Sequence, residues 1–195
     1  MKRFLYALGA LAIVPTTVVA SRVPEDTEKY LPVQQIESQP YSPNWKCPDC
    51  SPSEQYVLKE LQAKTRITDR NALSTILGNI KQESLFHANI CEGGARVPYS
   101  DCHRGGYGII QWTSTNRYLG LGKFADKYEC DPSTLQCQTR YMINENIFQR
   151  YLPMFEGGGQ TVSQYMVPAY YWLGWGIEGK RETYAYEYTK KLVKA

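Results

Sequence analysis

Glu83 is the residue of this chain whose position best suits acid–base chemistry. It follows Leu73, Ile76, Leu77 and Ile80, which are spaced as on the buried face of an amphipathic helix. That spacing places the Glu83 carboxyl at the border of the apolar face, where partial loss of solvent raises the pKa of a carboxyl group. A carboxyl that keeps its proton near neutral pH can act as a general acid. An exposed Glu in a last helical turn is the alternative for this residue taken alone.

A glycine-rich segment from Gly106 to Trp112 supplies groups that would suit a ligand beside such an acid. Its glycines allow the backbone to approach a bulky ligand, and Gln111 can both donate and accept hydrogen bonds. Tyr107 and Trp112 offer apolar ring faces with polar edges, a combination that suits sugar rings. The alternative is a glycine-rich turn followed by a buried Gln and Trp.

The N-terminal residues 1–20 are typical of a secretory signal peptide. Lys2 and Arg3 precede an apolar stretch over residues 4–14, and small residues end at Ala20. The apolar stretch is too short and too interrupted for a helix that spans a membrane, so we expect no stable membrane insertion unless the signal is retained. Without Lys2 and Arg3 the formal net charge falls from +3 to +1, which argues against nucleic acid as a partner.

The six cysteines form an even set in a chain that we expect to be exported, so disulfides are the favoured interpretation. We expect the local pairs Cys47–Cys50, Cys91–Cys102 and Cys130–Cys137, although other pairings of the six remain open. Cys47 and Cys50 have the spacing of zinc ligands, but no second pair with such spacing follows. We therefore predict no metal site and no cofactor.

The chain divides into the signal peptide, a proline-rich linker or arm over residues 21–52, and a compact domain over residues 53–195. Residues 86–115 are rich in glycine, and we expect loops there with at most a short hairpin. The rest of the domain is predicted to be helical, with helices over residues 53–64, 68–83, 116–128, 132–151, 161–173 and 181–193. Pro168 is expected to interrupt the fifth of these.

Taken together, Ile76-Leu77-Gly78-Asn79, Glu83-Ser84, the Gly106–Trp112 segment and Asp131-Pro132 resemble the phage tail lysozyme family of the lysozyme-like superfamily. The run from Lys180 to Ala185 is similar to the closing helix of that family, so the resemblance covers roughly residues 54–193. It implies a mainly α, lysozyme-like helical domain, with a small irregular or β-hairpin insertion after the helix of the catalytic Glu. Disulfide bonds would cross-link this domain.

The resemblance implies a muramidase that cleaves the β-1,4 bond between N-acetylmuramic acid and N-acetylglucosamine in the glycan strands of peptidoglycan. Glu83 would be the general acid, with Gln111 and the backbone near Gly108 lining the groove. Tyr107 and Trp112 would contact sugars or belong to the core. As second carboxylate we prefer Asp101, which neighbours Cys102, over Glu92. If neither acid faces the sugar, the resemblance implies a lytic transglycosylase.

Two features depart from the family pattern. Six cysteines and a signal peptide are unusual for a tail enzyme carried in a virion, so we expect a secreted or periplasmic protein. A virion location is the alternative, and the protein would be a monomer or part of a virion. The second feature is Pro168, which lies where the family keeps a continuous helix. It precedes three adjacent aromatics, of which Tyr170 is a candidate sugar contact and at least one must belong to the core.

A non-catalytic peptidoglycan-binding or virion structural protein is the alternative from another functional class. The presence of Glu83 argues against it.

Overall fold

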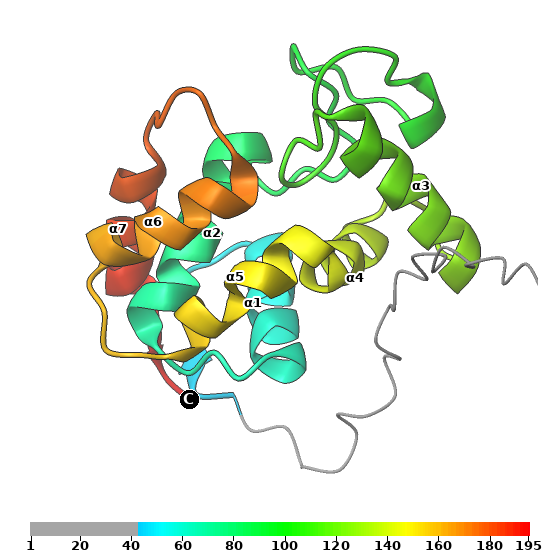
Figure 1. The fold of residues 1–195 in the computed structure, drawn as a ribbon. Helices are drawn as coiled ribbons and strands as arrows, with labels where there is room; N and C mark the ends of the chain where they lie inside the picture. Colours follow the sequence, from blue (N-terminus) through cyan, green and yellow to red (C-terminus); the bar gives the residue numbers. More distant parts are fainter. Residues whose placement is uncertain (1–42) are drawn as a thin grey trace, which may run out of the picture. The chain divides into compact units, whose positions relative to one another are not determined.

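The computed structural model describes residues 43–195, which form a mainly helical domain (Figure 1). The predicted signal peptide and the arm as far as residue 42 lie outside the described residues. In chain order the elements are β1 (Trp45–Lys46), α1 (Pro52–Lys64), α2 (Arg70–Ser84), the 3-10 helix η2 (Tyr99–Asp101), α3 (Thr115–Tyr128), α4 (Leu135–Asn144), α5 (Asn146–Glu156), α6 (Val162–Leu173), α7 (Arg181–Lys191) and β2 (Val193–Lys194). The prediction of a mainly α, disulfide-bonded domain is confirmed.

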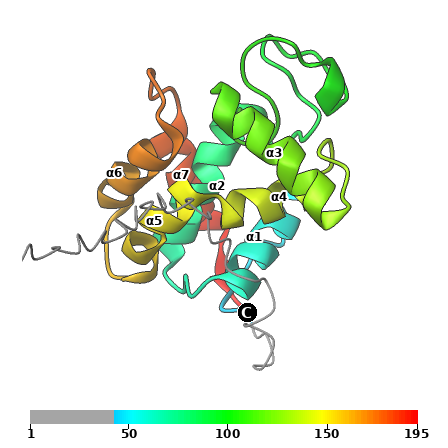
Figure 2. The same ribbon diagram turned by 45° about the vertical axis from the view of Figure 1, so that its right-hand side comes forward.

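Helix α2 is the central element of the domain. It contacts α1, α5, α6 and α7, and in Figures 1 and 2 it lies between α7 and α1. Asp69 begins the helix by accepting hydrogen bonds from the first free backbone N–H groups. The predicted apolar face is buried, but so are Thr75 and Asn79. The sequence pattern predicts that this second face of α2 is polar and exposed. It is buried by α6 and α7, because Asn79 contacts Met166 of α6 and Gly78 lies against α7.

Gly78 lets the backbones of α2 and α7 come into direct contact. A Cβ atom at this position would lie 2.5 Å from the backbone nitrogen of Ala185 and 2.9 Å from the carbonyl oxygen of Arg181. Real Cβ atoms do not approach backbone so closely, because such packing has no room for a methyl group. The glycine therefore sets how near the first turn of α7 lies to α2.

We expect Gly78→Ala to lower the free energy of unfolding by about 1–3 kcal/mol, the usual cost of overpacking a close contact. In an open helix the same change would raise stability by about 1 kcal/mol, so a decrease identifies the steric contact. Urea denaturation followed by circular dichroism measures the change. Gly176→Ala is the control, because a Cβ there meets no atom within 4 Å. Equal stability of the two variants would contradict the expectation.

The segment between α2 and α3 contains little regular structure. It has two isolated antiparallel bridges, Ile90 with Arg96 and Cys91 with Tyr107, together with η2. The Cys91–Cys102 disulfide closes this segment, and Cys130–Cys137 joins the end of α3 to α4. With Cys47–Cys50, all three predicted pairs are confirmed.

The helices differ from the prediction at three places. The helix expected over residues 181–193 ends at Lys191, because Val193 pairs with Lys46 in the short sheet. The long helix expected over residues 132–151 is two helices, because Glu145 between α4 and α5 has an extended backbone and turns its side chain to Arg117. The interruption expected at Pro168 is wrong, since α6 continues through it. A capping box at Thr161 and the buried ring of Trp172 hold the two ends of α6, so the loss of one backbone hydrogen bond is tolerated.

The last residues of the predicted arm pack against the domain. Trp45 and Lys46 pair with Lys194 and Val193 of β2, and both cysteines of the Cys47–Cys50 disulfide are buried. The compact structure therefore begins before the predicted boundary at residue 53. No helix among residues 43–195 is long and apolar enough to cross a membrane.

Candidate functional site

Glu83 lies in the last turn of α2, where the helix meets the glycine-rich segment. The helix ends at Ser84 because Leu85 and Phe86 adopt left-handed backbone conformations. The Ser84 hydroxyl donates a hydrogen bond of 2.8 Å to the carbonyl oxygen of Ile109. This bond ties the end of α2, and with it the Glu83 carboxyl, to the segment that the sequence singled out.

The Glu83 carboxyl is largely buried, with 15% of its side chain exposed. Burial raises its pKa above the ordinary value of a Glu, and the positive charges of Arg181 and Arg117 lower the pKa in part. The net direction is upward, so the predicted direction of the pKa shift is confirmed. This carboxyl keeps its proton to higher pH than an exposed Glu, as a general acid requires.

Arg181, the first residue of α7, forms an ion pair with Glu83. Its Nη2 lies 2.5 Å from Glu83 Oε1, and only 6% of the Arg181 side chain is exposed. The guanidinium stands over the ring of Trp175, 4.7 Å from the ring centre. Trp175 comes from the loop between α6 and α7, and Tyr170 meets it edge-on at 5.3 Å. The sequence analysis gave neither Arg181 nor Trp175 a role in the site.

A second arginine, Arg117 of α3, contributes charge to the same region. It holds Glu145 with two hydrogen bonds, 2.6 Å from Nε and 2.7 Å from Nη2. Its Nη1 lies 3.5 Å from the carbonyl oxygen of Leu173, at the end of α6. Arg117 thus links α3, the α4–α5 junction and α6, and its charge acts on Glu83.

Gln138 of α4 fixes the shape of the glycine-rich segment. Its buried side chain accepts a hydrogen bond of 2.9 Å from the Ile109 N–H and donates to the carbonyl oxygens of Ala88 and Pro132. Gly108 has φ of 76°, and a Cβ there would collide with the Gln138 amide. In this structure the glycine therefore serves close packing against Gln138, where the sequence analysis expected room for a ligand.

Tyr107 and Trp112 are fully buried, so neither offers a ring face to a sugar in this structure. Tyr107 donates a hydrogen bond to the Val97 carbonyl oxygen, and Trp112 packs against Tyr141 of α4. Both are core residues, which is the alternative that the sequence analysis kept for them. Gln111 is half-buried, and its amide donates to the carbonyl oxygens of Gly108 and Ile90.

The two acids considered as second carboxylate make contacts of their own. Asp101 lies in η2, is exposed and accepts a hydrogen bond from Ser100. Glu92 is exposed too, and it accepts a hydrogen bond of 3.0 Å from the Gly106 N–H. The ion pair that the structure forms at Glu83 is with Arg181, and neither acid takes part in it.

The aromatic run in α6 separates into exposed and buried rings. Tyr170 and Tyr171 are 47% and 57% exposed, whereas Trp172 is buried against Phe148. The expectation that at least one of the three belongs to the core is confirmed. Tyr170 is available on the surface, next to the Trp175 ring that covers Arg181.

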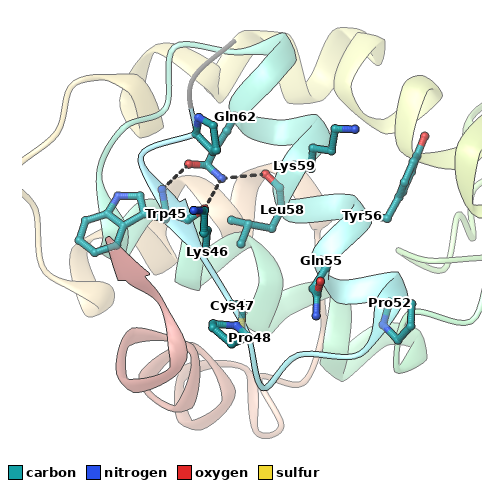
Figure 3. A pocket seen from close by; sticks show the side chains of 11 residues that line it. Trp45, Lys46, Cys47, Pro48, Pro52, Gln55, Tyr56, Leu58, Lys59 and Gln62 are labelled. Carbon is teal, nitrogen blue, oxygen red and sulfur yellow. Dashed lines mark hydrogen bonds between the residues drawn. The ribbon is translucent and has the colours of Figure 1, made fainter. Parts of the chain in front are cut away.

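A separate hollow of about 510 Å³ lies between β1, the Cys47–Cys50 loop and α1 (Figure 3). Trp45 and Tyr56 lie at its two sides, and the Gln62 amide is hydrogen-bonded to the Trp45 backbone and to the Leu58 carbonyl oxygen. None of the predicted catalytic or substrate-binding residues lines it. Within residues 43–195, no three His, Cys, Asp or Glu side chains are grouped to hold a metal ion.

Comparison with known proteins identifies the family of the chain. No curated protein and no solved structure shows significant similarity to the chain. The family model of the phage tail lysozyme matches residues 53–173, more than half of the sequence. The match includes Glu83 and the glycine-rich segment and ends with α6, so Arg181 and the run similar to a closing helix lie beyond it. The chain therefore belongs to the phage tail lysozyme family.

Proposed function

We propose that this protein cleaves the β-1,4 bond between N-acetylmuramic acid and N-acetylglucosamine in peptidoglycan, with Glu83 as the general acid. The observation that carries the proposal is the buried Glu83 carboxyl with its raised pKa, at the end of α2 and beside the glycine-rich segment. Membership of the family supports a lysozyme-like protein that acts on peptidoglycan.

In the proposed reaction the protonated Glu83 gives its proton to the glycosidic oxygen as the bond from that oxygen to the muramic C1 breaks. The positive charge that develops on the sugar is then quenched by a nucleophile. Attack by water gives hydrolysis, and attack by the muramic C6 hydroxyl gives a 1,6-anhydro sugar. In either case the attacking oxygen loses its proton to the Glu83 carboxylate, which restores the acid.

The lytic transglycosylase is the second candidate because of the contacts of the other acids. Hydrolysis generally needs a second free carboxylate opposite the acid. Asp101 is exposed and bonded to Ser100, while both oxygens of the buried Glu145 are bonded to Arg117. A reaction that activates no water has no need of such a carboxylate.

The three disulfides are compatible with an oxidising compartment, so we propose a secreted or periplasmic location.

Mass spectrometry of the soluble products from purified peptidoglycan tests the proposal. We expect muramic reducing ends from the wild-type protein, which identify a hydrolase. Products lighter by one water, with 1,6-anhydro ends, would identify the transglycosylase and remove any need for Asp101. If the wild-type protein released no glycan fragments, both enzymatic proposals would be wrong, and a binding or structural role would replace them.

A further inference from the structure

We propose that Arg181 is a positioning residue for Glu83, and that the segment from Gly174 to Arg181 completes the site although it lies beyond the family match. This inference rests on the proposed role of Glu83 as general acid. The matched residues contain the acid, and the residues after them supply the group that binds its carboxyl.

The backbone places Arg181 at Glu83. The two residues are 98 positions apart in the sequence, and they meet because α7 packs along α2. The backbones of these helices approach closely at Gly78, where a Cβ would lie 2.9 Å from the Arg181 carbonyl oxygen. Gly78 lies about 1.4 turns before Glu83 on α2. The contact at Gly78 therefore fixes the distance between the acid and the residue that pairs with it.

The loop before α7 fixes the Arg181 side chain. The Trp175 ring lies against the guanidinium, a favourable contact for a cation. At the other end of the loop, the Lys180 N–H donates a hydrogen bond of 2.8 Å to the Gln82 side chain, next to Glu83 on α2. Glu83 and Trp175 both contact the guanidinium, and the bond from Lys180 to Gln82 ties the start of α7 to α2, so the guanidinium is oriented before any substrate binds.

The Arg181 guanidinium is incompletely satisfied, which argues against a purely stabilising role. Its Nε and Nη1 are buried without a hydrogen-bond partner. Leaving buried donors of a charged group unpaired costs stability, and buried ion pairs are often replaceable by apolar residues without loss. An arginine that is buried at this cost and forms an ion pair with the candidate acid is therefore better explained by what it does for Glu83.

Arg181 opposes the effect of burial on the acid. Burial favours the protonated Glu83, and the guanidinium favours the carboxylate. After the Glu83 proton has moved to the glycosidic oxygen, the carboxylate that remains can pair with Arg181 at once. The guanidinium thus stabilises the charge that forms in the reaction, and it does so from a position fixed beforehand.

Three other charged groups or pairs in the described part of the chain lie near Glu83 and Arg181. Arg117 from α3 acts on Glu83 and is bound to Glu145 at the α4–α5 junction. Glu178, in the loop before α7, acts on Arg181. On α2, Lys81 pairs with Glu187 of α7 at 2.9 Å. This last pair joins the same two helices as the pair of Glu83 and Arg181, which makes it a matched control.

The test is the pH dependence of peptidoglycan cleavage by the full chain with Arg181→Gln, whose side chain is neutral but still donates hydrogen bonds. Because Arg181 lowers the pKa of Glu83, its loss raises that pKa, and the acid stays protonated to higher pH. We expect the alkaline limb of the kcat profile to move to higher pH. The maximal kcat should fall by up to about 10²-fold, as for the loss of one preorganised donor.

Arg181→Lys restores the charge, so its alkaline limb should lie closer to that of the wild type. Glu187→Gln breaks the matched ion pair between α2 and α7, and its limb should not move. Arg181→Met serves as a second neutral variant if Arg181→Gln does not fold. An unmoved limb in whichever neutral variant folds and cleaves peptidoglycan would overturn the role of Arg181 while leaving the proposed function in place. An inactive wild-type protein would overturn both.

Discussion

Glu83→Gln should reduce the cleavage of purified peptidoglycan by about 10²–10⁴-fold, the range that a general acid contributes. The amide has nearly the shape of the carboxyl but cannot transfer a proton. Release of soluble muropeptides, quantified by mass spectrometry, measures the loss. Glu187→Gln applies the same chemical change to α7, outside the site, and should leave cleavage close to that of the wild type.

The ion pair with Arg181 decides how this variant must be tested. A neutral Gln leaves the buried guanidinium without its counter-charge, and breaking a buried pair costs up to about 3–5 kcal/mol. The Gln oxygen can still accept a hydrogen bond from Arg181, so we expect a smaller loss of stability and a folded protein. Circular dichroism and thermal denaturation verify this. A folded Glu83→Gln protein with undiminished cleavage would show that Glu83 is not the acid.

The position of Glu83 could be predicted because its determinants are local. Apolar residues at helical spacing define the buried face of α2, and a residue at the border of that face loses part of its solvent. The disulfide pairs are local as well, since each joins cysteines 3, 7 or 11 residues apart. Both predictions, the position of Glu83 and the disulfide pairs, depend only on residues that are close to one another in the sequence.

The electrostatic partners of Glu83 could not be predicted in this way. Arg181 reaches it across 98 residues, through a helix contact that depends on Gly78. Arg117 pairs with Glu145, which is 28 residues away in the sequence. The break in the helix at Glu145 lies in a stretch whose pattern predicts one continuous helix. An ion pair leaves no periodic pattern in the sequence, and tertiary contacts override local propensity where they form.

Tyr107 and Trp112 illustrate a different difficulty. The local sequence around an aromatic residue in a glycine-rich segment is the same whether its ring stacks on a sugar or packs in the core. Tertiary packing decides between the two. The Tyr107 ring meets Tyr99 edge-on, and the Trp112 ring packs on Tyr141 from α4. The neighbouring Ile109 and Ile110, which are also buried, were the available signal that this segment is part of the core.

Removing the Cys91–Cys102 disulfide should lower the thermal stability of the domain substantially. The segment around it has only isolated bridges and one short 3-10 helix in the folded state, and the disulfide also restricts this part of the chain in the unfolded state. Closing a loop of this size stabilises a protein by roughly 3 kcal/mol in the chain-entropy description. For a domain of this length, that corresponds to a fall in Tm of about 6–12 °C.

Thermal denaturation of the Cys91→Ser/Cys102→Ser protein measures the effect, and Cys47→Ser/Cys50→Ser is the comparison. The second pair closes a loop with a sequence separation of 3 residues against 11, so its loss should cost less in chain entropy. We expect cleavage activity to fall with the first variant. Ile109 lies after this loop in the same irregular segment, and its carbonyl oxygen accepts a hydrogen bond from the Ser84 hydroxyl beside Glu83. Equal melting temperatures of the first variant and the wild type would contradict a structural role for this disulfide.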